Sequence, residues 1–157
     1  MTAFVLPLLI GVIAGLRAMT APAAVSWAVR LGWIKLPPEL WLNFLGYTFT
    51  PWIFTLLAIG ELITDQLPTT PSRTVPIQFG TRILLGLGMG ATIGAHGGAG
   101  SFFTGAIAGL IGAVIGTLGG RAARGKLAAA FGQDRPAALI EDAVAIVGAF
   151  LIVASIS

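Results

Sequence analysis

The residues of this chain that are best suited to chemistry are charged side chains within apolar segments. Arg17 lies near the middle of an apolar stretch, residues 3–29, which as a helix would be about 40 Å long. A guanidinium at mid-bilayer depth is costly and normally has a carboxylate partner. Glu61 and Asp65 lie one helical turn apart in a second apolar segment and are the candidate partners. We therefore predict a buried polar site for an ion or a small solute.

The first apolar stretch also contains a break. Gly15 and Pro22 flank Arg17 and Thr20, and proline removes a backbone donor and disfavours helix at the preceding residue. Non-helical backbone persists at membrane depth only where protein or a wet cavity satisfies its polar groups, as at the midplane sites of many transporters. A substrate site built on a broken helix is one interpretation, and a simple proline kink is the alternative.

Two further groups of polar residues are candidates. The segment 68–74 offers four hydroxyls and the guanidinium of Arg73 between prolines, a combination that suits an oxyanion; a rigid turn at the lipid headgroups is the alternative. Glu141 and Asp142 begin the last apolar segment. Adjacent residues point about 100° apart on a helix, so we expect at most one of them to face Arg17. They alternatively serve only to favour a helix N-terminus.

Together these considerations give the predicted set of binding residues. We expect no catalytic residue and no cofactor, and the type of any metal is left open. The predicted ion- or substrate-binding residues are Arg17, Thr20, Glu61, Asp65, Ser72, Arg73, Glu141 and Asp142.

The composition defines the kind of protein that must position these side chains. Of 157 residues, 56% are hydrophobic and 10% are charged, with a mean hydropathy of +0.94, whereas soluble domains carry about 25% charged residues. We predict one integral membrane domain over residues 1–157. The absence of cysteine excludes disulfides and thiolate metal sites. The few, scattered basic residues argue against nucleic-acid binding.

The apolar segments predict an all-α polytopic bundle of about five transmembrane helices, with the first helix broken. The segments cover residues 3–29, part of 40–67, 80–95, 102–118 and 137–154. A basic linker, residues 120–136, precedes the last one. Lysine and arginine are most frequent in the second and fourth loops, which with five spans favours a cytoplasmic N-terminus and an external C-terminus. A re-entrant first segment would change this count.

Glycines recur at helical spacing in the third and fourth segments. Such stripes let helix backbones approach closely, so we predict tight packing within the fold or across a homo-oligomer; a backbone-lined pore is the alternative. The stripes comprise Gly86, Gly90 and Gly94, followed by Gly105, Gly109, Gly112, Gly116 and Gly119.

Two motifs carry a resemblance to a known family. Residues 15–22 read GLRAMTAP and residues 60–73 read GELITDQLPTTPSR. Together with Glu141-Asp142 they resemble a bacterial family of small integral membrane proteins filed as a domain of unknown function. The resemblance covers nearly the whole chain and implies the bacterial inner membrane. It implies no activity and no catalytic residue.

Three functions remain for this chain. The first is a small transporter or channel, working as a homo-oligomer among membrane lipids, with its site around Arg17. The second is a membrane enzyme acting on a phosphorylated lipid or isoprenoid. Its Mg²⁺ would be held by Glu61, Asp65 and either acidic residue of the last segment, with Ser72, Arg73 and Arg82 on the phosphate. The third is a structural subunit whose polar residues only join helices.

Overall fold

All regular secondary structure in the described part of the protein is helical, as predicted. The computed structural model describes residues 2–67 and 75–157, so Ser72 and Arg73 lie outside the described residues. No strand occurs within those two ranges. The elements are α1 (Thr2–Leu16), α2 (Thr20–Arg30), a short 3-10 helix η1 (Trp41–Gly46), α3 (Thr50–Thr64), α4 (Pro76–His96), α5 (Ala99–Phe131) and α6 (Asp134–Ala154).

In the described ranges, two helices are long and apolar enough to cross a membrane. They are α5 over Gly100–Phe131 and α6 over Asp134–Ala154. Two other apolar helices, Ala3–Leu16 and Thr50–Thr64, are shorter, since the first predicted segment is divided into α1 and α2 and the second into η1 and α3. Helix α4, the third predicted span, has 21 residues like α6 but is not among the helices that are apolar enough. The structure therefore supports two of the five predicted spans by length and composition.

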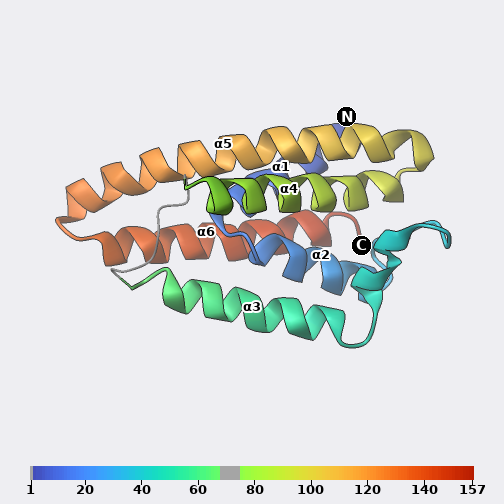
Figure 1. Cartoon of the computed structure of the whole chain (residues 1–157), viewed down its shortest axis with the longest axis horizontal. Coiled ribbons are helices and arrows are strands. Elements are labelled where there is room, and N and C mark those ends of the chain that lie inside the picture. Colours follow the sequence, from blue (N-terminus) through green and yellow to red (C-terminus); the bar gives the residue numbers. More distant parts are fainter. Residues whose placement is uncertain (1, 68–74) are drawn as a thin grey trace.

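The first apolar segment reverses direction at Arg17. Helix α1 ends at Leu16 and α2 begins at Thr20, so the predicted break is present. In Figure 1 the two helices form a hairpin, with α1 running toward the break and α2 running back from it. Helices of 15 and 11 residues are about 22 Å and about 17 Å long, and neither reaches across a hydrocarbon core of about 30 Å. Arg17 lies at the tip of this hairpin.

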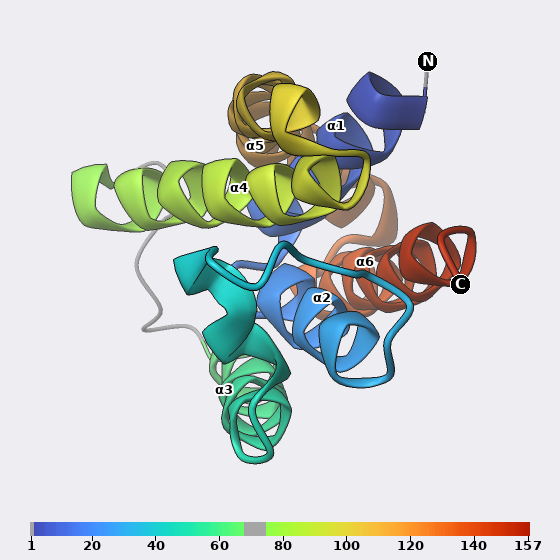
Figure 2. The same cartoon turned by 90° about the vertical axis from the view of Figure 1, so that its right-hand side faces the viewer.

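The reversal places both chain ends at the same end of the molecule. The N-terminus and the C-terminus lie on the same side along the long axis in Figure 1, and Figure 2 looks at the molecule from that side. A five-span bundle would put them on opposite sides. The difference follows from the hairpin, because two half-length helices return the chain to the side from which it came.

Glycine stripes join α5 to α4 and to α1. A Cβ on Gly109 would lie 2.0 Å from the carbonyl oxygen of Gly86, and a Cβ on Gly112 would lie 2.1 Å from that of Leu8. These backbones are therefore in direct contact, which is the close packing predicted within the fold. Gly119 is an exception, because a Cβ there meets nothing within 4 Å. The stripe on α5 ends at Gly116.

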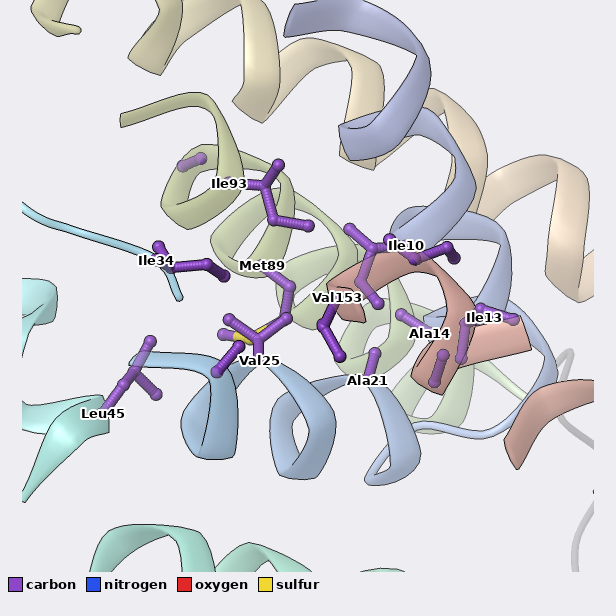
Figure 3. Close-up of a cluster of buried hydrophobic side chains, with 14 of the residues drawn as sticks. Ile10, Ile13, Ala14, Ala21, Val25, Ile34, Leu45, Met89, Ile93 and Val153 are labelled. Carbon is purple, nitrogen blue, oxygen red and sulfur yellow. The ribbon is translucent and has the colours of Figure 1, made fainter. Parts of the chain in front are cut away.

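A small apolar core fixes the hairpin between α4 and α6. Figure 3 shows Ile10 of α1, Val25 of α2, Met89 of α4 and Val153 of α6 pointing toward one another. All four are at most 5% exposed. This core holds α2 against the long helices and leaves the tip of the hairpin, with Arg17, facing the charged ends of α3 and α6.

Candidate functional site

Arg17 is the centre of a buried charge network. It is 0% exposed, and its guanidinium contacts carboxylates that follow α3 and that lie about two turns into α6, which begins at Asp134 and not at Glu141 as the apolar segment suggested. The Nε atom donates to Oδ1 of Asp142 at 2.6 Å, and Nη2 lies 2.7 Å from Oδ2 of Asp65. The Nη1 atom is 3.5 Å from Oε1 of Glu141, and it also donates to the carbonyl oxygen of Leu16 at 3.2 Å. The buried cation thus has the carboxylate partners that burial requires, although Nη2 contacts them as an ion pair without a hydrogen bond.

A second guanidinium, that of Arg124 in α5, shares two of these carboxylates. Its Nη1 donates to Oδ2 of Asp65 at 2.5 Å and lies 3.7 Å from Oε2 of Glu141. Its Nη2 donates to Asp134, at the start of α6, at 2.6 Å. Asp65 and Glu141 therefore each bridge Arg17 and Arg124, and the network continues from the hairpin tip to the α5–α6 turn.

Glu61 has a different role from the one predicted, because its contacts are to the α2 backbone and not to Arg17. Its Oε1 accepts the backbone N–H of Ala18 and its Oε2 accepts that of Met19, both at 2.8 Å. These amides precede α2 and have no partner within that helix. A carboxylate also stabilises the positive end of the helix dipole. Glu61 thus caps α2 from a neighbouring helix.

Arg82 of α4 binds the other side of the break, at the end of α1. Its Nη1 donates to the carbonyl oxygen of Gly15, near the end of α1, at 2.7 Å. Its Nη2 is 3.6 Å from Oε1 of Glu61, and Thr117 donates to the same Gly15 oxygen at 3.4 Å. Side chains of α3, α4 and α5 therefore bind both ends of the break, which is how irregular backbone persists at membrane depth.

The structure brings together five of the eight predicted residues: Arg17, Glu61, Asp65, Glu141 and Asp142. The expectation that at most one of the last two would face Arg17 is wrong. The guanidinium is a wide fork, and its Nη1 edge reaches Glu141 while Nε reaches Asp142. Thr20 is 7% exposed, and its hydroxyl has no hydrogen-bond partner among the described residues. That these residues bind a ligand stays a prediction.

Sequence reasoning missed Arg124, and it treated Arg82 only as a possible phosphate ligand. Residues 120–136 read as a basic linker, but most of them form the last turns of α5, which extends to Phe131. The alanines and leucine of residues 122–130 are strong helix formers. This propensity is a signal from which the extension of α5 to Phe131 could have been predicted. An extended α5 followed by a short turn places Arg124 opposite the first turn of α6.

The network is dense in ionisable groups. Among the described residues, three arginine side chains, at most 15% exposed, contact four carboxylates that are at most 17% exposed. The exposed Asp134 also contacts Arg124. Carboxylates grouped in this way suit a proton or a cation. Within the described residues, no group of three or more His, Asp or Glu is arranged to hold a metal ion.

Replacing Glu61 by glutamine should loosen the start of α2. An amide keeps one acceptor but turns an N–H₂ group toward a backbone donor, so one of the two amide hydrogen bonds is lost, at a cost of about 1–3 kcal/mol. We expect faster hydrogen exchange at the amides of Ala18 and Met19 in Glu61→Gln. Exchange in α5 serves as the internal control. Unchanged exchange at both amides would show that Glu61 does not cap the helix.

Comparison with known proteins gives no relative on which to base a function. No family model, curated protein or solved structure matches this chain. Membership of the family that the GLRAMTAP and GELITDQLPTTPSR motifs resemble therefore stays a prediction. The geometry of the site has to carry the functional argument.

Proposed function

We propose that this chain is a small multi-pass protein of the bacterial inner membrane that transports an ion or a small solute through the charge network around Arg17. One observation carries the proposal. A cluster of buried carboxylates and guanidinium groups lies at the tip of a half-length helix hairpin. Membrane transporters commonly place their sites where discontinuous helices meet, and ionisable groups within membrane segments generally mark ion or proton pathways.

The shared carboxylates provide a means of coupling binding to movement. Asp65 and Glu141 each contact both Arg17 and Arg124. A proton or cation that binds one of these carboxylates competes with a guanidinium for it. Breaking that ion pair weakens the contact between the hairpin and the α5–α6 turn. Transport then consists of alternating between arginine-bound and ligand-bound carboxylates.

A structural role is the second candidate, because every carboxylate of the cluster already has a guanidinium partner. In that case the network would only fix how the helices pack. The magnesium-dependent enzyme has less support, since its expected ligands face guanidinium groups, and the described residues contain no assembled metal-binding group.

The orientation that we propose differs from the one expected for five spans. Arg121, Arg124, Lys126 and Arg135 lie at the α5–α6 turn, whereas Arg30 and Lys35 lie toward the opposite end. The positive-inside rule assigns the more basic end to the cytoplasm. Because both termini lie at the other end, both are then external. We propose a homo-oligomer, since one short-helix bundle encloses little space for a pathway.

The transport proposal is tested in proteoliposomes. We expect flux of protons or of a monovalent cation above that of protein-free vesicles. Asp142→Asn should reduce the flux by about an order of magnitude or more. Loss of a charge from a buried ion pair costs more than about 1.4 kcal/mol, which corresponds to a factor of ten. The matched control is Glu39→Gln, which removes an exposed carboxylate outside the network. Flux at the level of empty vesicles for every ion and solute would favour the structural role.

A further inference from the structure

The loop between α2 and η1, residues 31–40, lies at the same end of the molecule as the α4–α5 turn (Figures 1 and 2). The first part of this loop is held by α2. The backbone amides of Trp33 and Ile34 both donate to the carbonyl oxygen of Ala28, at 2.9 and 3.1 Å, and Ile34 is 1% exposed within the apolar core. Lys35 is the next residue, and it is where the loop contacts a different helix.

Lys35 connects the loop to α4 through its backbone. Its N–H donates to Nδ1 of His96, the last residue of α4, at 2.9 Å. In the described ranges, no other hydrogen bond joins residues 31–40 to α4 or α5. A backbone N–H can only donate, so Nδ1 must have its lone pair free and the imidazole must be neutral. The contact therefore exists in only one of the two protonation states of His96.

Protonation converts the imidazole into a group that the Lys35 amide cannot bind. Both ring nitrogens then carry hydrogens, so two N–H groups would face each other. The imidazolium is instead favoured by its own helix, because a cation at the C-terminus of a helix interacts well with the helix dipole and the last carbonyl groups. His96 ends a helix of 21 residues. The neutral form thus binds the loop, whereas the charged form is favoured by the end of α4 alone.

The elements around His96 carry few other ionisable groups. Residues 83–120, which form most of α4 and of α5, contain no ionisable side chain besides His96, and η1 contains none. The loop itself carries Lys35 and Glu39, and Arg30 ends α2 just before it. All three are exposed, so water and salt screen their charges. Since histidine ordinarily titrates between about pH 5 and 8, protonation of His96 is the change that governs this contact.

We propose that His96 is a pH-dependent switch: its neutral imidazole holds the α2–η1 loop at the end of α4, and acidification of the solution at this end of the molecule releases the loop. Leu31 and Trp33 of the same loop line a groove of about 400 Å³ between α2, α3 and α6. The switch therefore makes a segment that borders this groove sensitive to pH. It involves no residue of the charge network around Arg17 and is independent of the transport proposal.

The test is solution NMR of the full chain in detergent micelles with isotopically labelled histidine and lysine. The chain has a single histidine and two lysines, Lys35 and Lys126, so each signal is assigned at once. Between about pH 7.5 and about pH 5, solvent exchange of the Lys35 amide, corrected for the intrinsic effect of pH, should become about three- to tenfold faster. The change should follow the titration of the His96 ring nitrogens. Lys126, within α5, is the internal control and should not change.

Two variants separate the acceptor from the charge. His96→Asn places an amide oxygen near the position of Nδ1 and keeps an acceptor that does not titrate, so exchange at Lys35 should stay slow at both pH values. His96→Leu removes the acceptor, so exchange should be fast at both. Equal exchange at Lys35 in the parent chain and in His96→Leu at the higher pH would overturn the inference. So would the parent's pH dependence in His96→Asn, or an equal acceleration at Lys126, which would show that acid loosens the whole bundle.

Discussion

Removal of the buried guanidinium in Arg17→Gln should lower the free energy of unfolding by about 3–5 kcal/mol. Arg17 is fully buried, and its loss leaves Asp65 and Asp142 without their nearest cation in a dry environment. The measurement is denaturant unfolding in detergent micelles, followed by far-ultraviolet circular dichroism. Arg30→Gln is the control, because Arg30 is exposed at the end of α2, and it should change stability by less than about 0.5 kcal/mol.

The double variant Arg17→Gln/Asp142→Asn separates the ion pair from other effects of the first substitution. Residues in direct contact give non-additive changes in stability. We expect the double variant to be destabilised by less than the sum of the two single variants, because neither charge is then left buried alone. Additive effects of the two substitutions would contradict the contact between Nε of Arg17 and Oδ1 of Asp142.

Two alanine substitutions on the same helix should differ in their effect on the free energy of unfolding. A Cβ on Gly109 would lie 2.0 Å from the carbonyl oxygen of Gly86 and 2.9 Å from the Cα of Gly90. Because both obstacles are backbone atoms, α4 and α5 must move apart. We expect Gly109→Ala to destabilise by about 3 kcal/mol, the upper part of the usual overpacking range. The same unfolding measurement reports the change.

The matched variant is Gly119→Ala, where a Cβ meets nothing within 4 Å. Alanine is favoured over glycine within a helix by up to about 1 kcal/mol, so this variant should be neutral or stabilised. Equal effects at both positions would show that the α4–α5 contact is looser than described. A stabilised Gly109→Ala would contradict the helix packing itself.

The helical class and the need of Arg17 for a carboxylate partner could be predicted from the sequence because both have local signals, whereas which carboxylates it meets could not. Arg17, Glu61, Asp65, Glu141 and Asp142 are conspicuous within apolar segments, where unpaired charges are costly. Gly15 and Pro22 likewise marked the break between α1 and α2. In each case, a charged residue, a glycine or a proline within an apolar segment indicated the feature.

The hairpin could not be predicted in the same way. Hydropathy gives the length of an apolar segment but does not tell whether the chain continues across a membrane or turns back. Residues 3–29 are apolar whether the chain crosses or turns back. Tertiary contacts decide between the two. Arg82 binds the carbonyl oxygen of Gly15, and Glu61 binds the amides of Ala18 and Met19. Without such partners, a turn at this depth would leave backbone groups unsatisfied. The direction therefore depends on residues far away in the chain.

The separation of Arg17 from Asp142 has a consequence for biosynthesis. The two residues are 125 positions apart, so at about 5–20 residues per second the ribosome makes Asp142 about 6–25 s after Arg17. Throughout that interval the hairpin tip lacks its closest acceptor. The hairpin is therefore expected to reach its final place last, after α6 has been synthesised. Chains truncated before α6 should be retained by insertion factors or degraded, even though α1 and α2 are complete.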